Sequence, residues 1–216
     1  MTQFEKVYYF IKKPWVIVLY TILVILVYYF VDKPLATYFY QFDFINKVPV
    51  LKLLTTLGQW IIYIILFVFG GLYFRYIQIN SAYEARAWYL LVCLLVANLI
   101  CLVLKVSLSR ARPDLLFTSN EFGFYWFKLN ESYWSFPSGH TITVISLAAS
   151  LSVLFPRYFY TFFIGALLVV ATRVLLCRHY LSDVMSAFYI SLFIVGFLTE
   201  YLKKRNWFNL NSAIES

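Results

Sequence analysis

Apolar residues fall into six runs of 17 to 22 residues along the chain, and most of the charged positions lie in the shorter segments between them. A helix needs about 20 predominantly apolar residues to cross a bilayer core about 30 Å thick. The pattern therefore predicts an all-α fold, a bundle of six transmembrane helices with short interfacial helices. We place the six at residues 15–31, 59–79, 87–104, 138–155, 158–177 and 181–202, the fourth only marginally long enough.

The segments between the runs carry residues typical of membrane-helix ends, namely Pro14, Pro156 and the sequence Lys203–Lys204–Arg205. Residues 34–44 are aromatic and too short to span, which is typical of an interfacial segment. The longest connection, residues 113–137, is also rich in aromatic residues, and we expect a lipid-facing or lid-like loop. The apolar region of a signal peptide has about 7–15 residues, and the first run is longer than this. No small-residue cleavage site follows the run, so we predict that it is a retained membrane anchor. We expect residues 1–216 to form one integral-membrane domain.

The composition favours a membrane protein and excludes other classes. Hydrophobic residues make up 62% of the 216 and charged residues 13%, whereas soluble domains are about 45–50% apolar and about 25% charged. So much apolar surface also excludes a disordered chain. The net charge of +8 could indicate a nucleic-acid binder, but the cations lie between apolar runs and not in one stripe. We therefore expect no nucleic-acid partner, and assign the charge to lipid headgroups or an anionic substrate. The three cysteines form no metal-ligand or disulfide pattern.

The basic residues also predict an orientation. Six spans place both termini on one side of the membrane, and that side carries 9 of the 18 Lys and Arg residues. The other side carries the remaining nine, of which three belong to a candidate binding site, so six are left to compare. Because cytoplasmic loops are enriched in Lys and Arg, we expect cytoplasmic termini and a site that faces the periplasm or exterior. We expect the membrane to be a bacterial inner membrane.

Three clusters of ionisable residues lie at predicted helix ends on the outward side. A charge at the bilayer centre costs about 2.5–3.5 kcal/mol on insertion scales, so each needs a reason. In the first cluster, Lys105 and Arg112 are seven residues apart, which places them on one helix face if the helix continues to Pro113. Taken alone, this pair is equally well explained as a basic collar at a helix end.

The second cluster is Ser138, Gly139 and His140, directly before the fourth run. Ser138 is a good N-cap, and Gly139 lets the backbone approach a ligand closely. The free N–H groups of a helix start bind anions, and His140 would lie beside them as a proton donor. The alternative interpretation is a capped turn with a bystander histidine.

The third cluster joins the fifth and sixth runs and contains Arg173, His179 and Asp183. His179 and Asp183 are four apart, so on a helix the carboxylate can accept a hydrogen bond from the imidazole. The other ring nitrogen is then free to act as a nucleophile or base. Arg173 lies within an apolar run, where a solitary guanidinium is costly without an anion. The alternative is a structural Arg–Asp pair with a capping histidine.

Taken together, the clusters supply both histidines of the chain, one acid, three cations and a helix start. Phosphoryl transfer needs positioning and stabilisation of negative charge on the equatorial oxygens, which this set provides. Asp183 and Asp114 are the only nearby acids, too few for a Mg²⁺ site. We therefore expect a histidine mechanism with no metal and no cofactor.

The three motifs resemble the signature of the type 2 phosphatidic acid phosphatases, a family that shares its site with the vanadium haloperoxidases. That signature is K-x6-RP, then PSGH, then SR-x5-H-x3-D. In this chain it runs from Lys105 to Pro113, from Pro137 to His140, and from Thr172 through His179 to Asp183. Thr172 replaces the serine and keeps a hydroxyl. The motifs span residues 105–183, and the six-run layout extends the likeness over nearly the whole chain.

The resemblance implies a membrane phosphatase with a role for each residue. His179 would attack phosphorus and become a phosphohistidine, Asp183 would orient it, and His140 would protonate the leaving oxygen. The residues that the resemblance assigns to the phosphoryl oxygens are Lys105, Arg112, Ser138, Gly139 and Arg173. The implied partner is a lipid phosphate or diphosphate in the membrane, and polyprenyl diphosphate, phosphatidic acid, phosphatidylglycerophosphate and lipid A all fit.

Other functions stay open at this stage. A lipid phosphotransferase would pass the phosphoryl group to a lipid acceptor in place of water. A non-catalytic lipid-phosphate carrier would keep the pocket, although the presence of His140, His179 and Asp183 argues against it. A haloperoxidase is disfavoured because the enzymes of that kind to compare are large and soluble. The sequence assigns no oligomeric state.

Overall fold

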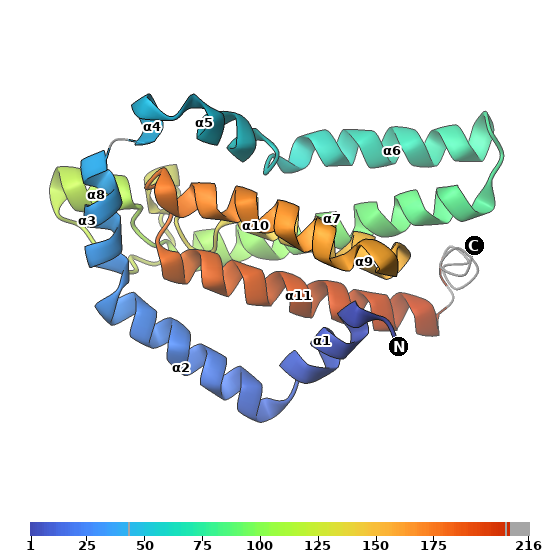
Figure 1. Cartoon of the computed structure of the whole chain (residues 1–216), viewed down its shortest axis with the longest axis horizontal. Coiled ribbons are helices and arrows are strands. Elements are labelled where there is room, and N and C mark those ends of the chain that lie inside the picture. The colour runs from blue at the N-terminus through green and yellow to red at the C-terminus, as the bar shows by residue number, and fades with distance from the viewer. Residues whose placement is uncertain (43, 206, 208–216) are drawn as a thin grey trace.

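The computed structural model describes residues 1–42, 44–205 and 207, which form an all-helical fold (Figure 1). Backbone groups inside a bilayer must pair within the chain, and a helix achieves this within one segment. Each of the six predicted runs forms a helix at its predicted place, and no strand occurs in these residues. The six helices are α2 (Pro14–Phe30), α6 (Trp60–Tyr76), α7 (Ser81–Leu108), α9 (Gly139–Leu154), α10 (Phe159–Leu175) and α11 (Leu181–Lys204).

The helices differ in whether they are long enough to cross a membrane. Four stretches qualify by length and composition: Pro49–Tyr76, Ser81–Leu108, Pro156–Leu175 and Leu181–Lys204. Helix α1 (Gln3–Ile11) and α2 qualify only as a pair, bent by 78°, at a break that precedes Pro14. Helix α9 has 16 residues, about 24 Å of rise, which is less than the hydrocarbon core. The described residues thus give an integral membrane protein with four to five apolar helices of spanning length.

Helix α9 lies at the centre of the bundle and packs against α7, α10 and α11. Twelve of its 16 residues are buried. The hydroxyls of Ser150 and Ser152 donate to carbonyl oxygens one turn earlier, both at 2.7 Å, so these buried polar groups are satisfied within the helix. The fourth predicted run is therefore a core helix, and its N-terminus lies in the middle of one end of the bundle.

The short elements gather mostly at that same end. Helices α3 (Asp32–Phe42), α4 (Phe44–Lys47), α5 (Pro49–Thr56) and α8 (Pro113–Ser119) lie at the left of Figure 1. The N-terminus and the last turn of α11 lie at the opposite end. The predicted interfacial segment 34–44 falls on α3 and the start of α4, except for Asp43, which is outside the described residues. The predicted 113–137 loop contains α8 and the 3-10 turn η1 (Glu131–Tyr133); a second such turn, η2 (Pro156–Tyr158), joins α9 to α10.

Candidate functional site

The predicted site residues meet at the end of the bundle that carries α3 and α8. A cavity of about 630 Å³ opens there, and both imidazoles line it. Ser138 and Asp183 are fully buried and lie outside the cavity wall. The other predicted residues are in the wall, namely Lys105, Arg112, Gly139, His140, Arg173 and His179.

The basic motif reaches the cavity in a different way from the one expected. Helix α7 ends at Leu108, and Ser109 adopts a left-handed conformation with φ 44°, so the helix does not continue to Pro113. Arg112 is instead the N-cap residue of α8, while Lys105 projects from the last turn of α7. The Lys105 ammonium donates a hydrogen bond to the Trp134 carbonyl at 2.6 Å. A turn, and not a continuous helix face, therefore brings the two cations to one cavity.

Both arginines in the cavity wall have a buried donor without an acceptor. The Nε atoms of Arg112 and Arg173 are buried and have no hydrogen-bond partner among the residues that the structure describes. Arg173 donates through a terminal nitrogen to the Thr55 hydroxyl of α5. Burial lowers the pKa of Arg112, as expected for a cation removed from water. Unpaired buried donors are costly, so this wall is suited to an anion with several acceptor oxygens, such as a phosphoryl group.

The start of α9 is where the sequence placed it, but its cap differs. Ser138 is the N-cap residue, yet its side chain makes no capping hydrogen bond and accepts one from the Thr141 hydroxyl at 3.0 Å. The Ser138 side chain therefore leaves the first N–H groups of α9 available to a ligand. A Cβ at Gly139 would lie 3.6 Å from Lys105 Cε, an ordinary contact, so packing within the protein does not by itself require this glycine.

His179 lies in the turn before α11 and is buried, with 4% of its surface exposed. Its Nδ1 atom is 2.7 Å from the Ser135 carbonyl oxygen. Because a carbonyl oxygen only accepts, Nδ1 must carry the hydrogen, and Nε2 keeps its lone pair. Burial lowers the pKa of His179 to about 3, helped by Lys105 and Arg173 and opposed by Asp183. The imidazole is therefore neutral at physiological pH.

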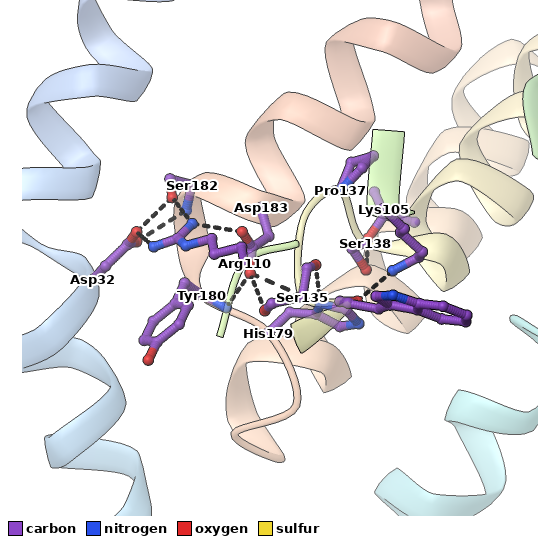
Figure 2. A network of polar contacts seen from close by, with 12 residues as sticks. Asp32, Lys105, Arg110, Ser135, Pro137, Ser138, His179, Tyr180, Ser182 and Asp183 are labelled. Carbon is purple, nitrogen blue, oxygen red and sulfur yellow. Dashed lines mark hydrogen bonds and ion pairs between the residues drawn. The ribbon is translucent and has the colours of Figure 1, made fainter. Parts of the chain in front are cut away.

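Asp183 contacts His179 less directly than the spacing suggested. The Nδ1 atom and Asp183 Oδ2 are 3.8 Å apart, too far for a hydrogen bond. Helix α11 begins at Leu181, so His179 is not on a helix and the i,i+4 geometry does not apply. Asp183 instead accepts a hydrogen bond from the Ser135 hydroxyl at 2.6 Å and one from the Tyr180 N–H at 2.9 Å (Figure 2). The Asp183 carboxylate thus binds the Ser135 hydroxyl, and the Ser135 carbonyl in turn binds His179.

Four buried residues that the sequence interpretation missed complete this network: Asp32, Arg110, Ser135 and Ser182. Arg110 is fully buried and donates to Asp183 at 2.5 Å and to Asp32 at 2.7 Å. One signal for Asp32 was present, since it is the sole acid between residues 6 and 42 and directly follows an apolar run. Arg110 was hidden among the other basic residues of its motif.

Within the described ranges, no group of three or more His, Cys, Asp or Glu side chains is placed to hold a metal ion.

A family model described as the PAP2 superfamily matches residues 86–207. The chain belongs to the PAP2 superfamily. This match contains all three motifs, and residues 1–85 of this PAP2 protein lie outside it.

Two curated relatives of this PAP2 protein are bacterial phosphatases. The Lipid A 1-phosphatase of Rhizobium johnstonii is 35% identical over 146 residues, which cover 62% of this chain and 59% of the relative. The Lipid A 1-phosphatase of Rhizobium etli is 34% identical over 126 residues, covering 58% and 48%. The matched region thus spans about half to three fifths of the relatives' own length. No solved structure matches the chain significantly.

Proposed function

We propose that this PAP2 protein is a metal-independent membrane lipid phosphatase that works through a phosphohistidine. One observation carries the proposal: segments far apart in the chain place two imidazoles and three cations around a single cavity. The relatives support the phosphatase class, since both are named Lipid A 1-phosphatase. We extend the proposal to one catalytic domain over residues 1–216, of which 43, 206 and 208–216 lie outside the described part.

In the first step, Nε2 of His179 attacks phosphorus and the bond from phosphorus to the ester oxygen breaks. The neutral imidazole supplies the electron pair, and its Nδ1–H keeps its hydrogen bond to the Ser135 carbonyl. His140, in the same cavity wall, gives its proton to the leaving oxygen. The phosphoryl group is then bonded to His179, and the dephosphorylated lipid is released.

In the second step, water attacks the phosphohistidine and His140 accepts the proton that the water loses. The bond from phosphorus to Nε2 breaks, which restores His179 and yields inorganic phosphate. Lys105, Arg112 and Arg173 stabilise the charge on the equatorial oxygens in both steps. The planar guanidinium groups suit two oxygens each, whereas Lys105 acts as a point charge.

Among lipid phosphates, we propose the 1-phosphate of lipid A as the substrate. The names of the two relatives support this choice. The cavity suits a lipid because apolar residues of α6 and α7 continue its wall to the outside of the bundle. They are Ile61, Leu95, Leu99 and Leu102, which are 50%, 41%, 63% and 48% exposed. The phosphate would lie among the cations while the acyl chains stay in the bilayer.

We also propose the topology that the charge pattern predicts: six spans with α9 as the buried fourth, cytoplasmic termini and the site on the outer side of a bacterial inner membrane. Arg110 is buried and its guanidinium is neutralised by the carboxylates of Asp32 and Asp183, so we count it with the site. This increases the difference in Lys and Arg count between the two sides of the membrane. The Lys and Arg residues outside the site then number nine on the side of the termini and five on the other.

The proposal predicts that His179→Ala abolishes phosphate release from the detergent-solubilised protein. We expect a loss of more than about 1,000-fold, because the proposed phosphohistidine cannot form without the His179 imidazole. Inorganic phosphate is measured in the presence of EDTA against lipid A, phosphatidic acid, phosphatidylglycerophosphate and polyprenyl diphosphate.

Arg178→Ala is the matched control, since Arg178 is the adjacent residue but its side chain is 43% exposed and pairs with Asp114 at 3.5 Å. It should keep most of the wild-type rate. Phosphate release by His179→Ala at the wild-type rate contradicts the mechanism. A second assay supplies a donor lipid whose phosphoryl group is labelled, together with a candidate acceptor lipid. Label that moves to the acceptor lipid, without appearing as inorganic phosphate, identifies a phosphotransferase.

A further inference from the structure

Asp32 lies outside the three motifs and outside the region matched by the family model, yet it is buried against the site. We propose that Asp32 is a positioning residue for the reaction: through Arg110 and Ser182 it fixes the start of α11 and the segment that orients His179. The inference rests on the proposed function. It adds the junction of α2 and α3 to the parts of the chain that build the site.

Asp32 is the first residue of α3 and is 1% exposed. One carboxylate oxygen accepts a hydrogen bond from the backbone N–H of Ser182 at 3.0 Å. The other accepts one from Arg110 Nη2 at 2.7 Å and one from the Ser182 hydroxyl. Asp32 thereby ties α3 to the first turn of α11, 150 residues later in the chain (Figure 2).

Arg110 connects Asp32 to Asp183, the acid of the third motif. Its Nη1 donates to Asp183 at 2.5 Å and to the Ser182 hydroxyl at 2.7 Å. The guanidinium therefore lies between two carboxylates, an arrangement that its planar fork of donors suits. Four aromatic rings surround the guanidinium and shield it from water. Their centroids lie 4.4 to 5.5 Å from the guanidinium carbon, and they belong to Tyr28, Phe122, Phe124 and Tyr180.

From Asp183 the contacts lead to His179 through one residue. The Ser135 hydroxyl donates to Asp183 at 2.6 Å, and the Ser135 N–H donates to the Arg110 carbonyl at 3.0 Å. The Ser135 carbonyl in turn accepts the Nδ1–H of His179 at 2.7 Å. Arg110 and Asp183 together therefore fix Ser135, and the carbonyl of Ser135 sets the direction in which Nε2 points.

The charges of the network also favour the proposed chemistry. Two carboxylates and one guanidinium leave a net charge of −1 behind Nδ1 of His179. Burial raises the pKa of Asp32, but Arg110 and the two Ser182 donors oppose this, and the close guanidinium keeps the carboxylate ionised. When Nε2 attacks phosphorus, the ring becomes positive, so a net negative network stabilises the transition state more than the ground state. Loss of the charge on Asp32 makes the network neutral.

Asp32→Asn tests the inference, because asparagine keeps the size but removes the charge. We expect kcat to fall by about 10- to 100-fold, the range for loss of a group that orients a reacting residue. The KM and the inhibition constant for orthovanadate should stay within about 3-fold, since Asp32 does not line the cavity and the phosphoryl contacts remain. The rate of phosphohistidine formation in a single turnover, after an alkaline quench, should fall by the same factor as kcat.

Thr199→Val is the matched control. Thr199 is on α11, the helix that also carries Ser182 and Asp183. It is 4% exposed and shares a buried hydrogen bond with Tyr89 at 2.8 Å, but it lies 16 residues, about 24 Å, from Asp183. It should lower the melting temperature and leave kcat unchanged. If Asp32→Asn does not fold, as judged by size-exclusion chromatography, Ser182→Ala removes one of the Asp32 contacts and should lower kcat by several-fold with KM unchanged.

Two results overturn the inference. One is an Asp32→Asn protein with kcat within about 2-fold of the wild type; when that variant does not fold, the same result for Ser182→Ala has this meaning. The other is a loss of kcat that Thr199→Val reproduces at an equal loss of stability. Failure of the proposed function is recognised separately, because there the wild type releases no phosphate or His179→Ala keeps the activity.

Discussion

At the scale of single residues, the nucleophile proposed here is held by a backbone carbonyl. The Ser135 carbonyl fixes the tautomer of His179 and the direction of the ring, while the Asp183 carboxylate lies 3.8 Å from Nδ1. The carboxylate therefore contributes charge without accepting the imidazole proton. This separates two tasks, orientation and electrostatic stabilisation, that one carboxylate performs in a Ser-His-Asp triad.

The burial of His179 predicts a dependence of stability on pH. Burial lowers the pKa of His179 in the folded protein to about 3, whereas the pKa of a histidine in an unfolded chain is about 6.5. Between these values the unfolded chain binds the extra proton. The contribution of His179 to stability is therefore fully present above about pH 6.5 and is lost as the pH falls toward 3. We expect the melting temperature in detergent to fall as the pH is lowered from 7 to 4.

His179→Gln provides the comparison, because glutamine is polar and does not titrate. Its melting temperature should fall less between pH 7 and pH 4 than that of the wild type, and the two proteins should change in parallel above pH 7. Identical slopes over the whole range mean that His179 is not buried as a neutral imidazole.

At the scale of elements, the turn between α5 and α6 sets the position of His140. A Cβ added to Gly58 would lie 2.4 Å from Cδ2 and 2.7 Å from Cβ of His140, closer than atoms can approach. Because one of these is the Cβ atom next to the backbone, rotation of the imidazole alone does not relieve the overlap. The close approach of the turn to α9 therefore requires glycine at this position.

Gly58→Ala should lower kcat by about 10-fold or more, because a proton donor displaced by even about 1 Å transfers its proton poorly. Gly165→Ala is the control, since Gly165 is exposed on α10 and a Cβ there would meet nothing within 4 Å. It should keep the wild-type kcat and raise the melting temperature slightly, because alanine favours a helix over glycine. Equal kcat values for the two variants contradict the role of the turn.

The start of α7 shows why apolar runs predict helices but not their ends. The run begins at residue 87, yet the helix starts at Ser81, where the Asn80 side chain accepts hydrogen bonds from Ala82 N and Tyr83 N, both at 3.1 Å. The polar first turns continue the helix beyond the apolar part. The C-terminal end depends on a distant contact, since the Ser109 hydroxyl accepts a hydrogen bond from Lys128 N at 2.8 Å.

At the scale of the whole molecule, helices α3 and α8, which lie beside the site, are at the opposite end of the bundle from the N-terminus and the last turn of α11 (Figure 1). The proposed orientation then places residues 113–137 on the periplasmic or exterior side of the membrane. The native cysteines are buried, at 0%, 3% and 7% exposure, so they should react slowly with a thiol reagent. An added cysteine can therefore report the side of the membrane.

Leu129→Cys should react with a membrane-impermeant maleimide in intact cells, because Leu129 is 82% exposed and belongs to the 113–137 connection. Lys204→Cys, at the exposed end of α11, should react only after the membrane is permeabilised. Labelling is measured by gel shift, with the unmodified protein as the control. The reverse pattern means that the site faces the cytoplasm.

The sequence by itself determined the local features of this protein. Six apolar runs formed helices because an apolar segment in a membrane must satisfy its own backbone. The three motifs supplied the residue types of the cavity wall, and their order indicated the family. These features depend on the chemistry of neighbouring residues, which is present in the printed order of the chain.

Only the tertiary structure decided which partners those residues have. An apolar surface suits lipid and protein equally well, so the runs could not show that α9 is the buried core helix. Buried polar groups must find donors and acceptors wherever the fold brings them, and no local rule pairs Asp32 with Ser182 or places Arg110 between two acids. The orientation of His179 likewise depends on Ser135, 44 residues earlier, because packing of helices and not spacing along the chain joins the two.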